Sequence, residues 1–279
     1  MQHTVLNLPG SGLSLRADAY GDEHAHPVIF LHGTAQSRRA WIAAAKKVAE
    51  SGYRGITVDL RGHGDSEWSA AGDYDVEAFT RDVECLLAWA RQPVTLVGAS
   101  RGGQAAFIAA SRFPQQVRLV VLADVVPRSE RSGISHIYTF LNQSLDGFAD
   151  VDEAADALAV LSNQPRAQDA SGLRKVMREG ANGRWFWQWD PACARPEFMA
   201  PPAEILLMEE AARQMRCPTV LVRGTHSDLV TLESVQQFKA LLPDLMVVEA
   251  VGQGHMFTGD VNDTFATSLH DYLERFSKL

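Results

Sequence analysis

Cysteine is scarce in this chain, with only Cys85, Cys193 and Cys217 among 279 residues. An odd number without metal-ligand spacing indicates neither a disulfide framework nor a zinc site, and it favours a reducing compartment. Long apolar runs are also missing, since none approaches the roughly 20 residues that span a bilayer. The N-terminus lacks the basic and then apolar layout of a signal peptide. We therefore expect a soluble cytoplasmic protein with no membrane partner.

Clusters of basic residues are absent as well. The chain has 26 Lys and Arg against 34 Asp and Glu, which gives a formal net charge of −8. Nucleic-acid binding needs clustered positive charge, so the sequence argues against a nucleic-acid partner. Hydrophobic residues make up 46% and charged residues 22%, as in a globular protein that buries a sizeable core.

The order of apolar segments predicts an α/β fold. Residues 28–31 form a continuous apolar run, which is typical of a buried strand, and the mainly apolar segment 117–123 is read as another strand; such strands alternate with amphipathic helices. This alternation predicts a mostly parallel central sheet flanked by helices. It stops after Pro127 and resumes at about Arg216, so we expect a core of residues 1–127 and 216–279. Residues 128–215, with helical patches and no buried strand run, are expected to form an inserted helical cap.

One stretch displays a candidate nucleophile. The apolar run Val94–Val97 reads as a strand, and small residues after Ser100 read as the start of a helix. Gly98, Ser100 and Gly102 match the G-x-S-x-G pattern, in which the glycines allow a sharp strand-to-helix turn. Such a turn exposes the serine hydroxyl at the edge of the sheet.

A serine hydroxyl needs an imidazole base, and the imidazole in turn needs a carboxylate partner. The carboxyl ends of parallel strands meet at one edge, where ligands bind. A strand ending at Val222 is followed by Asp228, and a later strand is followed by His255. Asp124 also follows a strand, but it is equally well explained as a structural carboxylate leading into the cap. We therefore predict Ser100, Asp228 and His255 as the catalytic residues, with Asp124 as the alternative acid.

In this order of motifs the chain resembles the α/β-hydrolase superfamily over nearly its whole length. More narrowly, Gly254-His255-Met256 and the segment 183–191 resemble a bacterial subgroup described as peroxidase-like or epoxide-hydrolase-like hydrolases. The resemblance implies an oxyanion hole made by the backbone N–H groups of Thr34, after His32-Gly33, and Arg101. The Arg101 side chain departs from the leucine, methionine or glutamine more usual there. We expect it to form a structural ion pair, with a bias toward acidic substrates as the alternative.

The cap holds an aromatic stretch at 184–191. Core packing is expected for most of these side chains. One tryptophan, Trp187, together with Phe140, Leu229 and Met256, is predicted to line an apolar pocket over Ser100. Such a lining favours a hydrophobic acyl or alcohol group.

Two histidine-containing loops are possible metal sites. His24 and His26 lie in a polar loop without carboxylate partners, and the loop 59–66 has the glycines and alternating charges of a rigid turn. We therefore predict no metal or other cofactor.

The predicted function is a serine hydrolase that cleaves a small to medium carboxylic ester or lactone through an acyl-enzyme on Ser100. The resemblance also implies a perhydrolase side activity, in which hydrogen peroxide replaces water. The alternatives are a carbon–carbon bond hydrolase of the same fold and a non-catalytic ligand-binding homologue. Epoxide hydrolysis and haloalkane dehalogenation are disfavoured, because those relatives use an aspartate where this chain has Ser100. The sequence does not specify the oligomeric state.

Overall fold

The computed structural model describes residues 1–162, 165–166, 168–198, 201–255 and 263–276. Its centre is an eight-stranded sheet in the order β1-β2-β4-β3-β5-β6-β9-β10. These strands are β1 His3–Pro9, β2 Ser14–Tyr20, β3 Pro27–Leu31, β4 Arg54–Val58, β5 Val94–Ala99, β6 Val117–Ala123, β9 Thr219–Gly224 and β10 Met246–Ala250. The pairs β1–β2 and β2–β4 are antiparallel and the other pairs of this sheet are parallel. The predicted α/β class with a mostly parallel sheet is confirmed.

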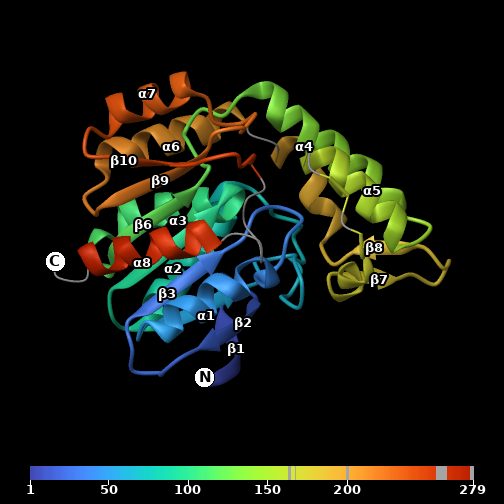
Figure 1. The fold of residues 1–279 in the computed structure, drawn as a ribbon, viewed down its shortest axis with the longest axis horizontal. Helices are drawn as coiled ribbons and strands as arrows, with labels where there is room; N and C mark the ends of the chain where they lie inside the picture. Colours follow the sequence, from blue (N-terminus) through green and yellow to red (C-terminus); the bar gives the residue numbers. More distant parts are fainter. Residues whose placement is uncertain (163–164, 167, 199–200, 256–262, 277–279) are drawn as a thin grey trace.

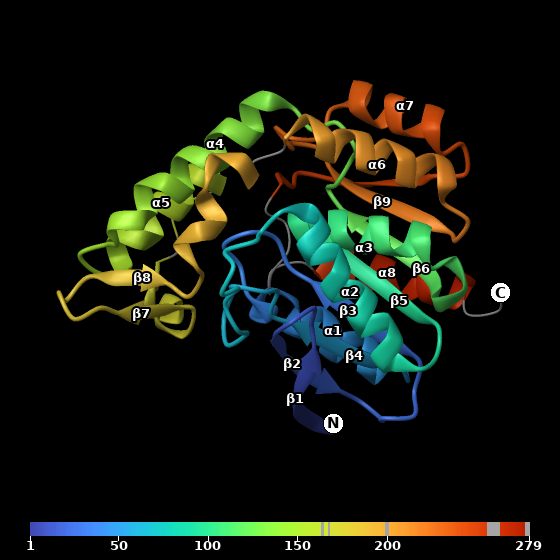
Figure 2. The ribbon, with the colours of Figure 1, turned by 180° about the vertical axis from the view of Figure 1, so that it is seen from behind.

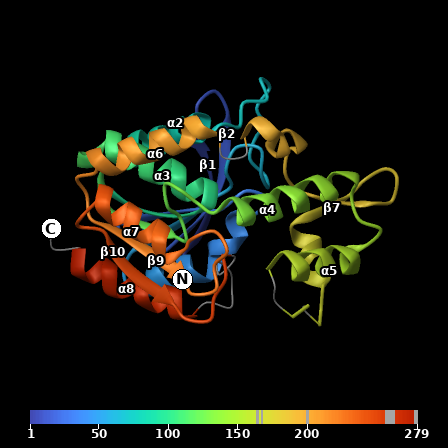
Figure 3. The same cartoon turned by 90° about the horizontal axis from the view of Figure 1, so that it is seen from above.

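Helices cover both faces of the sheet (Figures 1 and 2). They are α1 Ile42–Glu50, α2 Val76–Ala90, α3 Ser100–Arg112, α6 Pro202–Gln214, α7 Leu232–Leu241 and α8 Asp263–Phe276, and the 3-10 helix η1 Arg38–Trp41 precedes α1. Helices α1 and α8 pack together on one face, whereas α2, α3 and α6 cover the other. The view from above shows the sheet between these two layers (Figure 3).

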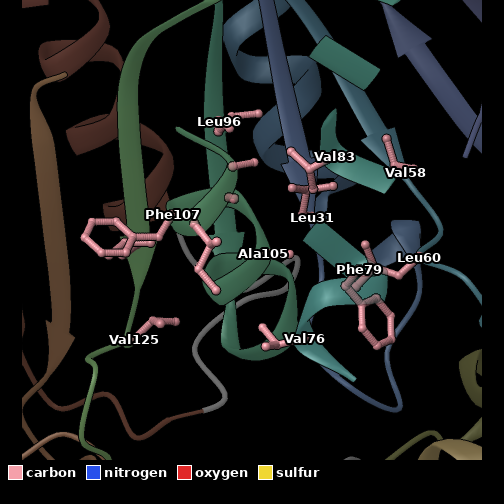
Figure 4. Close-up of a cluster of buried hydrophobic side chains, with 14 of the residues drawn as sticks. Leu31, Val58, Leu60, Val76, Phe79, Val83, Leu96, Ala105, Phe107 and Val125 are labelled. Carbon is pink, nitrogen blue, oxygen red and sulfur yellow. The ribbon is translucent and has the colours of Figure 1, made fainter. Parts of the chain in front are cut away.

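The core forms where the central strands are apolar on both sides. β3 and β5 are buried along their whole lengths, as their continuous apolar runs predict. Leu31 and Leu96 project from these strands toward Val83 of α2 and Ala105 of α3 (Figure 4). The alanines of α3 let this helix lie close to the sheet, which brings its first turn, with Ser100, against the end of β5.

The segment between β6 and β9 forms a lobe beside the sheet (Figures 1 to 3). It contains α4 Arg131–Gln143, α5 Val151–Ser162, β7 Met177–Glu179 and β8 Trp185–Trp187, and we call these four elements the cap. Only helices were expected in this segment, but β7 and β8 pair as an antiparallel hairpin. Aromatic residues favour extended backbone, and the turn at Gly180–Gly183 returns the chain. Helix α6, which the expected insertion included, packs instead against α3.

Two features that bear on function are absent from the described residues. None of the helices in the described ranges has both the length and the hydropathy needed to cross a bilayer. Within the same ranges, no three His, Cys, Asp or Glu side chains gather in a way that could hold a metal ion.

Candidate active site

Ser100 lies at the sharp turn that joins β5 to α3. Its φ of 45° is in the left-handed region, where a side chain other than glycine is strained. The turn is also crowded, because a Cβ on Gly98 would lie 2.5 Å from the Cα of Gly103. A Cβ on Gly102 would lie 2.4 Å from the carbonyl oxygen of His32. The two glycines of the pentapeptide are therefore required by close backbone contacts, as the sequence pattern predicted.

His255 follows β10, and its ring is held by a carboxylate. Its Nδ1 lies 2.8 Å from Oδ2 of Asp124, whose side chain is fully buried. Asp124 directly follows β6, and its Oδ1 accepts a hydrogen bond of 3.0 Å from the backbone N–H of Gly224. The hydroxyl of Ser227 donates to Oδ2 at 2.5 Å. The carboxylate is thus fixed by three donors and oriented toward the imidazole.

The expected pairing of Asp228 with His255 is not the one that the structure contains. The Asp228 side chain is 52% exposed and lies 3.3 Å from Nδ1 of His136 in α4. In the turn after β9, the Ser227 hydroxyl donates to Asp124 and accepts hydrogen bonds from the N–H groups of Leu229 and Val230. This turn directs the side chain of Asp228 outward. Because β6 is the direct neighbour of β5 in the sheet, the carboxylate at its end lies closer to the nucleophile turn than one after β9.

The turn after β3 carries Thr34, the expected partner of Arg101 in the oxyanion hole. Gln36 closes this turn, since its N–H donates to the Gly33 carbonyl at 3.2 Å and its side-chain oxygen accepts the Gly33 N–H at 2.9 Å. Arg101 lies in the first turn of α3, where backbone N–H groups lack an acceptor within the helix. Both residues line the same cavity as Ser100 and His255.

Two buried histidines support this turn. Nε2 of His32 accepts the N–H of Leu60 at 3.0 Å, so its Nδ1 donates to the Gly33 carbonyl at 2.7 Å. Nε2 of His63 accepts the N–H of Ala35 at 3.2 Å, and its Nδ1 donates to the Arg61 carbonyl at 2.8 Å. Burial lowers the pKa of His32 to about 4 and that of His63 to about 3. Both rings are therefore neutral at physiological pH, in a defined tautomer.

The side chain of Arg101 forms a buried ion pair. Its Nη1 donates to Oε2 of Glu204 at 2.6 Å, and its Nη2 donates to the Phe198 carbonyl at 2.6 Å. Gln104 donates to the other oxygen of the same carboxylate at 2.6 Å. Glu204 lies in α6, so this cluster joins α6 to the helix that begins with the candidate nucleophile. An ion pair at Arg101 was expected; its partner was not identified from the sequence.

A cavity of about 700 Å³ lies over Ser100. Of the predicted pocket residues, Phe140, Trp187 and Leu229 line it, and Met256 falls outside the described residues. The rings of Phe140 and Trp187 have centroids 6.2 Å apart. Further apolar side chains come from α4 and α5 of the cap, including Ile137 and Leu158. Apart from Arg131 at the start of α4, the cap elements therefore contribute apolar side chains to the cavity, and most of its polar groups lie at the edge of the sheet.

Three residues with a place in this site were not predicted. Ser227 holds Asp124, His63 holds the turn that carries Thr34, and Glu204 pairs with Arg101. Their signals were weak, because a serine beside an aspartate, a histidine in a glycine-rich loop and a glutamate in a helix are all common. Only the sheet order and the packing of α6 bring them to the site.

Comparisons with known proteins place the chain in a family. The model of the alpha/beta hydrolase fold matches residues 26–260. The non-heme chloroperoxidase CPO-A1 of Kitasatospora aureofaciens is 37% identical over 268 residues, covering 89% of this chain and 92% of that protein. The sn-1-specific diacylglycerol lipase ABHD11 of Mus musculus is 26% identical over 271 residues, covering 91% and 82%.

A solved structure has the same fold. The crystal structure of E-2-(acetamidomethylene)succinate hydrolase matches with a TM-score of 0.81 at 22% identity and covers 100% of both chains. The sequence resemblance, the strained serine turn and the parallel sheet agree with these matches. The chain belongs to the alpha/beta hydrolase fold family.

Proposed function

We propose that the protein is a serine hydrolase that cleaves small to medium carboxylic esters or lactones. The observation that supports this most is the hydrogen-bonded pair of buried Asp124 and His255 in the same cavity as the strained Ser100. The family and its esterase and lipase relatives support hydrolysis of esters in general.

In the proposed reaction, Nε2 of His255 takes the hydroxyl proton of Ser100 while Oγ attacks the ester carbonyl carbon. The imidazolium that forms is stabilised by Asp124 through Nδ1–H. The N–H groups of Thr34 and Arg101 donate to the tetrahedral oxyanion, and each such donor is typically worth about 3 kcal/mol. His255 then gives its proton to the leaving alkoxide as the carbon–oxygen bond breaks. Water, deprotonated by the same imidazole, releases the acid from Ser100.

Labelling with a fluorophosphonate tests this proposal. Peptide mass spectrometry of the folded protein is expected to find the adduct on Ser100, and Ser100→Ala is expected to remain unlabelled. Ser129→Ala is a matched control, since Ser129 lines the same cavity and is expected to leave labelling unchanged. Absence of an adduct on freshly folded wild type would contradict the proposal. An ester panel run beside Ser100→Ala separates turnover from a ligand-binding role.

Perhydrolysis is a second candidate activity, favoured by the name of the chloroperoxidase relative. In this reaction hydrogen peroxide attacks the acyl-enzyme in place of water, and the product is a peracid. Peracid formation from acetate and peroxide is expected to disappear in Ser100→Ala. If the variant forms peracid as fast as the wild type, the activity does not use this serine.

A reducing compartment is part of the same proposal. The cysteines Cys85, Cys193 and Cys217 are free thiols in the structure. Their unpaired state agrees with a compartment where disulfides are not maintained.

A further inference from the structure

The cavity over Ser100 has an excess of positive charge. Its lining includes four arginines and two carboxylates, although the whole chain has a formal net charge of −8. The residues are Arg39, Arg101, Arg128 and Arg131, against Asp124 and Glu204. In an acidic protein, such a local excess needs a reason.

Ion pairs account for part of this charge. Arg101 is neutralised by Glu204 at 2.6 Å, and both side chains are buried. Arg128 lies 2.6 Å from Glu209, a carboxylate outside the cavity lining. Asp124 is engaged by His255. These contacts exclude Arg101 as a receptor for an acidic substrate, because its guanidinium already donates to Glu204 and to the Phe198 carbonyl.

Arg39 and Arg131 are different. Both line the cavity and both are exposed to solvent. Among the residues that the structure describes, neither Arg39 nor Arg131 forms an ion pair with a carboxylate. Arg39 lies in η1, just after the turn of Thr34, and Arg131 begins α4, which follows the Asp124 end of β6. Because they line the cavity and are also exposed, we assign Arg39 and Arg131 to its mouth, whereas Phe140 and Trp187 are buried under the cap.

We infer that the substrate of this site carries an anionic group, a carboxylate or a phosphate, which Arg39 and Arg131 bind at the mouth of the cavity. The inference rests on the proposed ester hydrolysis and specifies its substrate class. The apolar limb of such an ester lies toward Phe140 and Trp187 beneath the cap. Planar guanidinium groups bind carboxylates and phosphates well, and a local positive potential increases the rate of encounter with anions.

Binding to a catalytically silent variant tests the inference apart from turnover. The probes are 4-phenylbutyrate and its neutral amide, titrated by calorimetry into Ser100→Ala at low salt. The acid is expected to bind about tenfold more tightly, because two exposed ion pairs supply an advantage of that order. Added salt is expected to reduce this preference. The combined Arg39→Gln and Arg131→Gln changes are expected to abolish it without changing the affinity for the amide.

Arg118→Gln is the matched control. Arg118 is exposed at the opposite end of β6, away from the cavity, and its loss removes the same charge from the chain as either single change, Arg39→Gln or Arg131→Gln. It is expected to keep the preference for the acid. The inference would be overturned if Ser100→Ala bound the acid and the amide with equal affinity. It would also be overturned if Arg118→Gln lost the preference for the acid as fully as the combined Arg39→Gln and Arg131→Gln changes.

Turnover then distinguishes this inference from the proposed function. Wild type is expected to hydrolyse the mono-4-nitrophenyl ester of glutaric acid with a kcat/KM about tenfold above that of its neutral methyl ester. A second pair of substrates consists of nitrophenyl butyrates with and without a carboxylate on the nitrophenyl ring. Comparing the two pairs shows whether the anionic group belongs to the acyl or to the alcohol part of the substrate. Turnover of neutral esters without either preference overturns the inference alone. Preferential binding of the acid without any ester turnover contradicts only the proposed reaction.

Discussion

The Oδ2 atom of Asp124 accepts hydrogen bonds from both Nδ1 of His255, at 2.8 Å, and the hydroxyl of Ser227, at 2.5 Å. Because both donors share this oxygen, a carboxylate after β6 connects His255, which follows β10, to the loop after β9. Three neighbouring strand ends are thereby held in one arrangement. The orientation of the imidazole consequently depends on Asp124.

Asp124→Asn is expected to lower kcat on a 4-nitrophenyl ester by about 10⁴-fold, because an amide in this place favours the wrong tautomer of the histidine. Asp228→Asn is the matched control and is expected to change kcat by less than about threefold, since its side chain is half exposed and contacts His136. Thermal unfolding of both variants checks that they fold. A large loss in Asp228→Asn with an active Asp124→Asn would reverse the assignment of the acid.

Arg101 and Glu204 are expected to stabilise the fold only when both are present. Replacing one partner leaves an uncompensated buried charge, which typically costs about 3–5 kcal/mol of unfolding free energy. We expect Arg101→Met and Glu204→Met each to be strongly destabilising. The double variant is expected to recover much of the loss, because two apolar side chains of similar length fill the site.

Urea unfolding of the two single variants and the double variant measures this coupling. The exposed pair Arg112–Glu77 provides a control cycle, for which a coupling of at most about 1 kcal/mol is expected. Additive effects in the Arg101–Glu204 cycle would show that the two charges are stabilised independently.

Much of the fold follows from local sequence pattern. Buried runs such as Val28–Leu31 and the stripe of α2 determined the strands and helices, and the glycines around Ser100 determined the turn. These signals depend on neighbours in sequence. The order of strands in the sheet does not, which is why Asp228 and Asp124 were ranked in the wrong order as partners for His255.

The remaining parts of the site depend on contacts between distant segments. Glu204 is about a hundred residues from Arg101, and nothing in the sequence of α6 indicates that its first turn faces α3. Trp185 and Trp187 lie in the segment for which only helices were expected, and the pairing of this stretch with β7 makes it a strand. Such pairings are set by tertiary packing, so local propensity did not resolve them.

Phe140 is expected to influence the preference for chain length. Its ring lines the cavity and is 8% exposed, in contact range of Trp187. Phe140→Ala removes apolar surface beneath the cap, so longer acyl chains lose more stabilisation than acetate, at up to about 0.8 kcal/mol for each buried methylene. We expect the ratio of kcat/KM for 4-nitrophenyl hexanoate over acetate to fall several-fold. Phe113→Ala, at an exposed position outside the cavity, is expected to leave this ratio unchanged.

His63 is expected to make the protein less stable in acid. Burial lowers the pKa of His63 to about 3, against about 6.5 in the unfolded chain. Below pH 6.5 the unfolded chain therefore binds a proton that the folded protein does not. The unfolding free energy then falls by about 1.4 kcal/mol per pH unit on account of this ring, down to about pH 3. Above pH 6.5 the ring is neutral in both states and causes no change.

His63→Gln removes this titration but loses part of the hydrogen bonding to Ala35 and Arg61. We expect the variant to be less stable at pH 7, by about 1–3 kcal/mol, and to lose stability less steeply between pH 6.5 and 4. Urea unfolding across this pH range measures both effects. His24→Gln, at an exposed position, is expected to keep the slope of the wild type. A slope that stays the same in His63→Gln would mean that this ring is protonated equally in the folded and unfolded states, contrary to its complete burial.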